Sequence, residues 1–444
     1  MRILLVGSGG REHALAWKLT GSPRLEQLWV APGNAGTARL DDRVKNVAIA
    51  ADDVDGLVAF ASTNAIGLAV IGPEAPLARG LGDALRSTGI AVFGPNRAAA
   101  EIESSKAFSK DFMARHGIPT ARYGVFRDHT EALRHLLSID YPVVIKASGL
   151  AAGKGVIVPA CADEAEAALR QIMLDREFGE AGDEAVIEER LTGPEVSVLA
   201  FSDGHTVRVM PPAQDHKRVG DGDTGLNTGG MGAYAPAPIA TPELIADVTR
   251  SVLQTTIDGL RAEDRPFVGV LYAGLMLTPD GPRVLEFNAR FGDPETQVIL
   301  PLLESDLVEV LLACAEGRLG DIDVNWSQGA AACVVMASEG YPGPYPKDLP
   351  IAGLDQATTD AFVFHAGTRE LAEQVVTAGG RVLAVSGWGV DIRSALDRAY
   401  AAVGSITFAG MHFRRDIGWR ALVRGAGSAG ARGPGASTSA PMSS

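Results

Sequence analysis

A run of acidic, amide and arginine side chains between residues 284 and 297 carries the clearest chemical signal in this sequence. The residues before Asn288 alternate like a β-strand, so Glu286 and Asn288 should project from the same face and offer two oxygens to one hard cation. We therefore predict a Mg²⁺ site on this pair. Arg290 follows two residues later, and its planar guanidinium suits a phosphoryl or carboxylate group beside the metal. Together these residues predict ATP chemistry.

Two lysines bracket a loop of small residues earlier in the chain. Lys146 ends an apolar strand, and Lys154 lies just before Gly155 and a second short strand. A lysine is usually a solvated surface residue, but a charge at the end of an apolar strand is costly without a partner. We therefore predict a hairpin in which both lysines point at the phosphates of a nucleotide, with Lys106 at the start of the preceding helical segment.

Acidic residues at the end of a later strand leave two interpretations open. Glu188 and Glu189 end that strand, and Glu195 follows a Gly-Pro pair. One interpretation is that they are exposed surface acids. The other is that the chain around Glu189 and Leu191 presents backbone groups to an adenine, while Glu195 binds ribose hydroxyls.

Residues 211–236 are polar and glycine-rich, and a loop of this length usually has a function. The segment does not fit the spacing of a calcium-binding loop. Its tightly grouped charges and its glycines, which let backbone N–H groups approach a ligand, favour a substrate-binding loop. The candidate residues are Asp215, Lys217, Arg218, Asn227, Gly229 and Gly230.

A glycine turn follows the first strand of the chain, residues 3–6. The pattern G-x-G-x-x-G fails because Glu12 occupies the last position, which makes a dinucleotide site a weak interpretation. Backbone N–H groups near Gly10, together with Arg11, lie at the start of a helix and favour an anion such as a sugar phosphate. A purely structural turn is the alternative.

Composition restricts the class of protein. The net charge of −14 argues against a nucleic-acid partner, because neutralising a phosphate backbone requires a basic surface. Three widely spaced cysteines indicate neither a disulfide framework nor a zinc site. The first apolar run is too short for a secretory signal, and no run of about 18 apolar residues could cross a membrane. We expect a cytoplasmic enzyme with no membrane partner.

The order of expected elements predicts several domains within 444 residues. Strands and helices alternate over residues 1–100, which predicts an open parallel α/β domain with ligand-binding loops at its strand ends. A central region covers residues 101–325. Residues 326–424 predict a small α+β domain with antiparallel strands and two helices, at 370–378 and 391–402. Residues 425–444 are predicted to form a disordered tail.

Taken together, these motifs resemble the phosphoribosylamine–glycine ligase family, also called glycinamide ribonucleotide synthetases, which are ATP-grasp enzymes of purine biosynthesis. The resemblance spans residues 1 to about 424. Its most specific part is the sequence Arg-Phe-Gly-Asp-Pro-Glu-Thr-Gln at residues 290–297. Further agreement lies at residues 9–13, 146–155, 215–218, 227–232, 339–343 and 415–418.

The resemblance implies an ATP-grasp architecture for residues 101–325, with a lid at about 120–192. It also implies that ATP phosphorylates glycine and that the amine of 5-phosphoribosylamine then attacks the glycyl phosphate, giving glycinamide ribonucleotide, ADP and phosphate. By analogy Glu286 and Asn288 hold Mg²⁺ or Mn²⁺, and Arg290, Asp293 and Lys154 are the catalytic residues. The ATP-binding residues implied are Lys106, Lys146, Lys154, Gly155, Glu188, Glu189, Leu191 and Glu195. The substrate-binding residues implied are Gly10, Arg11, Asp215, Lys217, Arg218, Asn227, Gly229, Gly230 and Arg290.

The sequence departs from the family pattern at two places. Leu226 stands where many members have proline, and the strand around Gly274 offers no further acid to the metal. We expect a monomer whose partners are the small molecules ATP, glycine and 5-phosphoribosylamine. The alternatives are another ATP-grasp carboxylate–amine ligase or biotin-dependent-type carboxylase, a nicotinamide-dependent oxidoreductase, and a non-catalytic nucleotide sensor.

Overall fold

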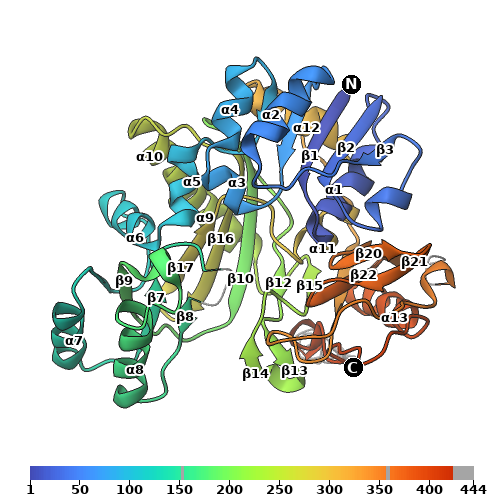
Figure 1. The fold of residues 1–444 in the computed structure, drawn as a ribbon. Helices are drawn as coiled ribbons and strands as arrows, with labels where there is room; N and C mark the ends of the chain where they lie inside the picture. Colours follow the sequence, from blue (N-terminus) through green and yellow to red (C-terminus); the bar gives the residue numbers. More distant parts are fainter. Residues whose placement is uncertain (152–154, 357–360, 424–444) are drawn as a thin grey trace, which may run out of the picture.

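The computed structural model describes residues 1–151, 155–356 and 361–423 (Figure 1). Lys154 and the predicted disordered tail, residues 425–444, lie outside these ranges. Four larger sheets of four or five strands form the described part, with helices packed around them. The expected arrangement of sheets is present: a parallel α/β sheet at the N-terminus, two antiparallel central sheets and a small α+β unit at the C-terminus.

The N-terminal sheet is parallel, in the order β3-β2-β1-β4-β5. Its strands are β1 (Arg2–Gly7), β2 (Gln27–Pro32), β3 (Val44–Asn46), β4 (Leu68–Ile71) and β5 (Ala91–Phe93). Its helices are α1 (Gly10–Thr20), η1 (Thr37–Arg39), α2 (Val54–Thr63), α3 (Glu74–Ala78) and α4 (Leu81–Ser87). The strand order reverses between β1 and β4, and the crevice at such a point is where open α/β sheets bind ligands.

Two helices lead from this sheet into an antiparallel sheet of order β6-β9-β7-β8, which is the region expected to be a lid (Figure 1, lower left). The helices are α5 (Arg97–Ser104) and α6 (Lys106–Arg115). The strands are β6 (Tyr123–Phe126), β7 (Val143–Ala147), β8 (Val156–Ile157) and β9 (Ala185–Glu189), covered by α7 (His129–Ser138) and α8 (Ala162–Met173), with η2 (Gly179–Gly182) before β9. The predicted hairpin around residues 146–155 is present as the pair β7 and β8.

The second central sheet is antiparallel, in the order β11-β10-β16-β17, and carries the acidic motif on its edge strand. Its strands are β10 (Glu195–Asp203), β11 (Val207–Val209), β16 (Val268–Thr278) and β17 (Gly281–Asn288). The neighbouring helices are α9 (Pro242–Val248), the π-helical η4 (Thr249–Gln254), α10 (Thr255–Ala262), α11 (Thr296–Ile299), η5 (Leu300–Leu302), α12 (Leu307–Ala315) and η6 (Leu319–Asp321). The register of β16 and β17 shifts after Gly274, so that Leu285 has no opposite residue and forms a bulge beside Glu286.

The fourth sheet joins the central region to the C-terminal unit, in the order β12-β15-β18-β22-β19. Its strands are β12 (Gln214–Asp215), β15 (Gly232–Ala235), β18 (Ala330–Ala337), β19 (Ala361–His365) and β22 (Arg381–Gly389), packed by α13 (Ile392–Val403). The hairpin β13 (Arg218–Gly220) and β14 (Thr224–Asn227), with η3 (Asp221–Asp223) between its strands, lies between β12 and β15 in sequence. The predicted substrate loop is therefore anchored at both ends in the C-terminal sheet.

One expected helix is wrong. Residues 370–378 do not form a helix but belong to the hairpin β20 (Thr368–Leu371) and β21 (Gln374–Thr377). Ala372 and Glu373 both have positive φ, which makes a tight turn between the strands. The β-branched Val375 and Val376 are buried, and such residues favour a strand.

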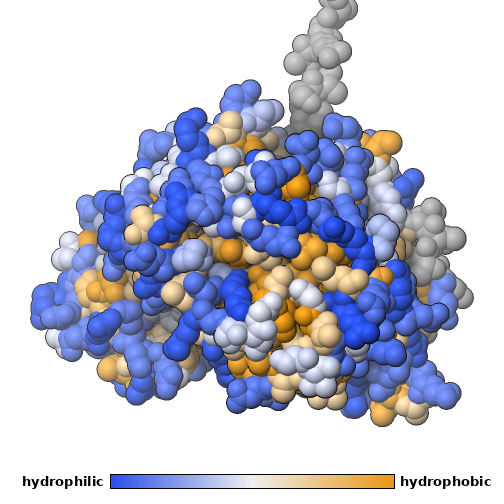
Figure 2. Space-filling view, turned by 90° about the horizontal axis from the view of Figure 1, so that it is seen from above, coloured by the Kyte–Doolittle hydropathy of each residue, from blue (hydrophilic) through white to orange (hydrophobic). Residues whose placement is uncertain are grey.

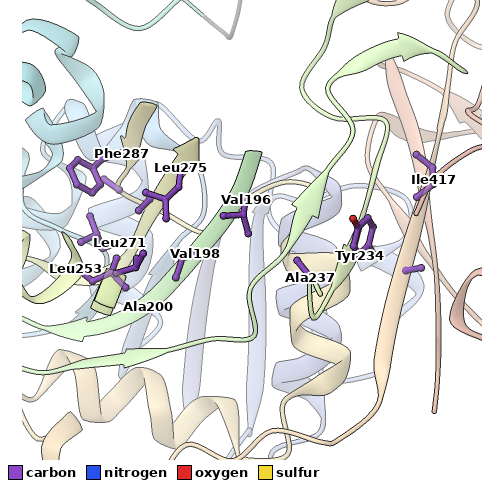
Figure 3. Close-up of a cluster of buried hydrophobic side chains, with 14 of the residues drawn as sticks. Val196, Val198, Ala200, Tyr234, Ala237, Leu253, Leu271, Leu275, Phe287 and Ile417 are labelled. Carbon is purple, nitrogen blue, oxygen red and sulfur yellow. The ribbon is translucent and has the colours of Figure 1, made fainter. Parts of the chain in front are cut away.

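The largest apolar cluster packs the central sheet against its helices and continues into the C-terminal unit (Figure 3). Val198, Leu271 and Phe287 come from three adjacent strands, and Leu253 covers them from the helical side. These side chains alternate along β10 and β16 with a second apolar set, which includes Leu199 and Val270 and packs into a different buried cluster on the opposite face of the sheet. The core therefore fixes the strand on which Glu286 lies.

The surface shown in Figure 2 is mostly hydrophilic, with apolar residues gathered near the middle of that face. Among the helices of the described residues, none combines the length and apolar character that a bilayer span requires.

We predict that Leu271→Ala lowers the free energy of unfolding by about 2–5 kcal/mol, because it leaves a cavity in the core under β17. Leu137→Ala is the matched control, since this leucine is 66% exposed on α7 and should change stability by less than about 0.5 kcal/mol. Urea denaturation of both variants measures the difference. Equal effects would mean that this part of the apolar cluster does not support the central sheet.

Candidate active site

Glu286 and Asn288 lie two residues apart near the end of β17. Burial opposes ionisation of Glu286, but four surrounding basic side chains outweigh it and hold the pKa of its carboxyl below the usual value. These side chains are Lys106, Lys146, Lys217 and Arg290. Glu286 is therefore ionised at neutral pH, as a metal ligand must be.

The surroundings of this pair suit a hard cation with few protein ligands. Gly274 lies opposite Glu286 on β16, and a Cβ atom placed there would be 3.5 Å from the Glu286 Cγ. Over the described residues no three acids, histidines or cysteines gather into a metal-binding group. Mg²⁺ commonly takes one or two protein oxygens and completes its shell with water and substrate phosphates. Glu286 and Asn288 fit that kind of site.

A buried ion-pair group lies beside this site, and we call Lys106, Lys110, Lys146 and Glu188 the lysine cluster. Lys146 Nζ lies 2.8 Å from Glu188 Oε1, and Lys110 Nζ lies 2.8 Å from Glu188 Oε2. Lys146 Nζ also donates to the carbonyl of Leu285 at 3.2 Å. The bulge at Leu285 thus brings the end of β17 and the lid sheet together.

Ionisation in the lysine cluster follows from these pairs. Burial opposes the charge of Glu188, but Lys146 and Lys110 reverse that effect, so its pKa lies below the usual value. Burial lowers the pKa of Lys110 to about 8, although Glu188 counteracts it. Burial also lowers the pKa of Lys106, whose Nζ donates to the Gly149 carbonyl at 3.2 Å. The cluster is an ordered set of cations suited to phosphate oxygens.

The four residues expected to bind the nucleoside make different contacts in the structure. Glu188 points into the lysine cluster, while Glu189 forms an ion pair with Arg122 at 3.0 Å. Glu195 pairs with Lys217 at 2.7 Å, and Leu191 is half-buried after β9. Gly155 is buried just before β8. Their roles toward ATP stay predictions.

Arg290 ties the acidic motif to the N-terminal sheet. Its guanidinium lies 3.1 Å from Glu103 and 3.5 Å from Glu74, and it donates to Asn288 Oδ1 at 3.3 Å. Burial disfavours the charge of Arg290, but Glu103 and Glu74 together keep its pKa above the ordinary value. Burial raises the pKa of Glu103 despite Arg290. Three elements, α3, α5 and β17, therefore fix the arginine beside the candidate metal ligands.

Glu12 fills the crevice between β1 and β4. A Cβ atom at Gly72 would lie 2.1 Å from Glu12 Oε1, and one at Gly7, whose φ is +128°, would lie 2.5 Å from the Glu12 Cγ. The Glu12 carboxylate accepts from the Gly9 N–H at 2.6 Å and from Arg11 Nε at 2.6 Å. Arg11 Nη1 also donates to the Phe291 carbonyl at 3.1 Å. The Glu12 side chain therefore fills the space that Gly7 and Gly72 leave open between the two strands.

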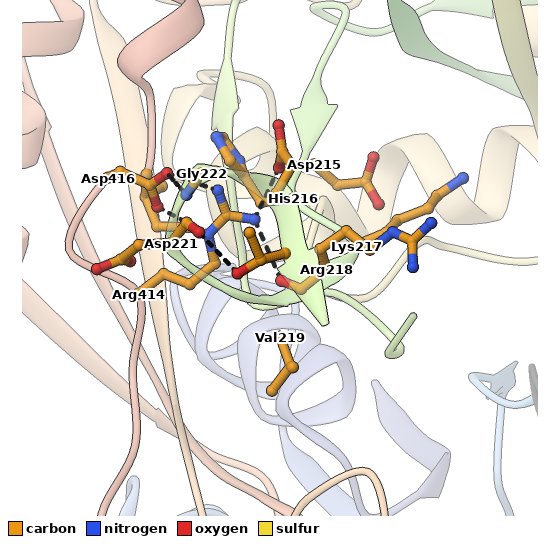
Figure 4. A network of polar contacts seen from close by, with 12 residues as sticks. Asp215, His216, Lys217, Arg218, Val219, Asp221, Gly222, Arg414 and Asp416 are labelled. Carbon is orange, nitrogen blue, oxygen red and sulfur yellow. Dashed lines mark hydrogen bonds and ion pairs between the residues drawn. The ribbon is translucent and has the colours of Figure 1, made fainter. Parts of the chain in front are cut away.

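Asp215 and Lys217 enter the site from β12 and the residues after it (Figure 4). Burial raises the pKa of Asp215 to about 7, although Lys217 counteracts it. Glu195 and Asp215 keep the pKa of Lys217 above its usual value in spite of burial. Arg218 and Asn227 face each other across the exposed hairpin, where Arg218 Nη1 donates to the Gly225 carbonyl at 2.7 Å. The loop therefore places only part of its charge in the interior.

A buried arginine of the C-terminal unit holds this hairpin (Figure 4). Arg414 is fully buried, and its guanidinium lies 2.8 Å from Asp223 and 2.8 Å from Asp416. Asp416 in turn accepts from the Gly222 N–H at 2.8 Å. The loop between β12 and β15 is thus fastened to the segment that holds Arg414 and Asp416, near the end of the described residues.

Sequence reasoning missed several residues of this site. No sequence motif marks Glu74 or Glu103, because these residues contact Arg290 only in the folded chain. Lys110 could have been found, since it lies four residues after Lys106 and shares its face of α6. Arg381, which contacts Asp293, lies 88 residues from it and left no local signal.

Comparison with known proteins gives three consecutive family matches. Residues 1–103, 104–296 and 331–420 match the N domain, the ATP-grasp (A) domain and the C domain of phosphoribosylglycinamide synthetase. A phosphoribosylamine–glycine ligase of Pasteurella multocida is 52% identical over 425 residues, covering 96% of this chain and 99% of that protein. The chain belongs to the phosphoribosylglycinamide synthetase family. It is therefore an ATP-dependent ligase with the ATP-grasp fold.

Further relatives agree with membership of the phosphoribosylglycinamide synthetase family. The Nostoc phosphoribosylamine–glycine ligase is 54% identical over 95% of this chain and 99% of its own length. The crystal structure of the Thermotoga maritima phosphoribosylamine–glycine ligase matches with a TM-score of 0.81 at 33% identity, covering 94% of this chain and all of that one. A biotin carboxylase domain of Hydrogenobacter thermophilus, with a TM-score of 0.68 and 19% identity over 93% of this chain and 91% of that one, shares the fold.

We predict that Glu188→Ala lowers the free energy of unfolding by about 3–5 kcal/mol, because it leaves Lys110 and Lys146 buried without their shared partner. Glu189→Ala is the control on the next residue, where the partner Arg122 is 62% exposed and the loss should stay below about 1 kcal/mol. Denaturant titration of both variants at pH 7 compares them. A loss in Glu188→Ala no larger than in the control would contradict the assignment of a structural ion-pair cluster.

Proposed function

We propose that this ligase joins glycine to 5-phosphoribosylamine through a glycyl phosphate, and that it takes ATP to ADP and phosphate. The observation that carries the proposal is the ionised Glu286 surrounded by four basic side chains, because this arrangement can gather several anions at one point. Family membership supports the choice of substrates. Two proteins named phosphoribosylamine–glycine ligase are 52% and 54% identical to this chain over 99% of their own length.

The first step transfers the γ-phosphoryl group of ATP. A carboxylate oxygen of glycine attacks the γ-phosphorus, and the bond from that phosphorus to the oxygen of ADP breaks. We assign Lys106 and Lys146 to the phosphates of ATP, together with Lys154 and Gly155 of the loop between β7 and β8. Arg290 faces the glycine carboxylate or the phosphate forming on it, because its planar fork pairs with either anion.

Glu286 and Asn288 would hold Mg²⁺ or Mn²⁺. When bound there, a divalent cation offsets the negative charge that builds up on the transferring phosphoryl group. The arrangement of Arg290 between Glu103 and Glu74 keeps its side chain from swinging out of place when the substrates bind. Positioning of this kind lets electrostatic stabilisation act without reorganisation.

The second step forms the amide. The amine nitrogen of 5-phosphoribosylamine attacks the carbonyl carbon of glycyl phosphate, the bond from that carbon to the phosphate oxygen breaks, and the amine proton leaves with the phosphate. We assign the acceptor to Gly10, Arg11 and the loop bearing Asp215, Lys217, Arg218, Asn227, Gly229 and Gly230, with Asp293 as a catalytic residue beside this acceptor site. Glu189, Leu191 and Glu195 are assigned to the nucleoside end of ATP, whereas Glu188, which the sequence also placed there, holds Lys146 and Lys110 in the lysine cluster. We also propose that the enzyme is a cytoplasmic monomer and that it has no nucleic-acid partner.

We predict that Glu286→Gln lowers kcat by at least about a hundredfold and raises the concentration of Mg²⁺ needed for half-maximal rate, because the variant keeps the shape but loses the charge. Coupled detection of ADP with glycine and 5-phosphoribosylamine measures both effects. Glu166→Gln, on the exposed face of α8, is the control and should behave like the unmodified enzyme. Turnover within about twofold of the control at low Mg²⁺ would refute the assignment of Glu286.

A further inference from the structure

Arg381 at the start of β22 reaches out of the C-terminal unit to two segments of the central region. Its Nη1 donates to the carbonyls of Gly229 at 2.7 Å and Asp293 at 2.9 Å, and lies 3.4 Å from the carbonyl of Gly230. Its Nη2 lies 3.2 Å from the Asp293 carboxylate. One guanidinium therefore holds both the backbone and the side chain of Asp293 while it holds the glycine loop.

The two glycines of this loop are required by its packing. A Cβ atom at Gly229 would lie 3.2 Å from the Arg381 Cζ, so a larger residue would crowd the guanidinium. Gly230 has a φ of +109°, and a Cβ atom there would lie 2.5 Å from the Pro294 Cδ. The Gly229 N–H donates to the Tyr341 hydroxyl at 3.1 Å. The loop is thus pressed between the C-terminal unit and the turn at Asp293.

Asp293 links the contact with Arg381 to the N-terminal unit. Gln297 Nε2 donates to Asp293 Oδ1 at 2.8 Å, and the same nitrogen lies 2.8 Å from where a Cβ atom of Gly10 would be. The positive charges of Arg381 and Arg11 both act on Asp293, together with that of Arg290, and keep its pKa below the usual value although burial opposes this. The three parts of the chain therefore meet at one carboxylate.

We propose that Arg381 is a positioning residue for the acceptor: it sets the glycine loop and the Asp293 turn in the single arrangement that binds 5-phosphoribosylamine. The inference rests on the proposed function. ATP phosphates are assigned to the lysine cluster on α6 and the lid sheet, whereas Arg381 comes from a different sheet and contacts the loop and the turn assigned to the acceptor. Loss of Arg381 should therefore affect the two substrates unequally.

The test compares Arg381→Ala, Arg381→Lys and a control, Arg369→Ala, by steady-state kinetics with each substrate varied in turn. Arg369 is an arginine of the same unit that pairs with Asp348 on the surface, where both side chains are about half exposed. We expect Arg381→Ala to raise the KM for 5-phosphoribosylamine by about tenfold or more, because several hydrogen bonds to a charged group are lost, and to leave the KM for ATP within about twofold. Arg381→Lys should lie between, since an ammonium keeps the charge but cannot hold three carbonyls and a carboxylate in one plane.

Thermal melting separates a folding defect from a positioning defect. Should Arg381→Ala not fold, Arg381→Lys keeps the charge in place, and its KM values decide the question. Parallel rises in the KM for ATP and for 5-phosphoribosylamine, or values equal to those of Arg369→Ala, would overturn the inference. Absence of any product from the unmodified enzyme and from Arg369→Ala would instead overturn the proposed function, so the two failures are distinguishable.

Discussion

The burial of several ionised side chains in one place is the constraint on which the rest of this structure depends. A buried charge is expensive unless it has a partner. Glu286 is surrounded by basic side chains, Arg290 lies between two acids, and Glu188 holds two lysines. These partners come from several separate parts of the chain, among them α3, α5, α6 and β7. The charges can therefore stay ionised only if the separate parts of the chain are assembled around them.

Irregular features of the sheets and of their connections bring these charged side chains together. The bulge at Leu285 turns a carbonyl toward Lys146 and places Glu286 beside the lid sheet. The strand reversal between β1 and β4 leaves a crevice, and Glu12 fills it and holds Arg11 toward the acidic motif. The loop after β12 begins and ends in the C-terminal sheet, so its position depends on that unit. All three parts of the chain thus contribute to the candidate site.

Local sequence patterns correctly predicted the elements whose formation depends on local interactions. The buried strand before Gly7 and the lysine hairpin follow from apolar runs and glycine turns, and both are present. The helix expected at 370–378 was wrong, because the positive-φ turn at Ala372 and Glu373 is not visible in a helical spacing of apolar residues. The contacts of Arg290 with Glu74 and Glu103, and of Arg381 with Asp293, join residues 88 to 216 positions apart, and no local pattern encodes them. The individual roles of the site residues stay predictions.

The central claim is that the gathered positive charge lets ATP phosphorylate the carboxylate of glycine before the amide forms. Glycine labelled with ¹⁸O in its carboxylate tests this most directly. If the account is correct, one labelled oxygen leaves glycine and appears in the inorganic phosphate, detected by mass spectrometry, for each molecule of product formed. Phosphate that carries no label, while labelled glycine is fully converted to product, would contradict it.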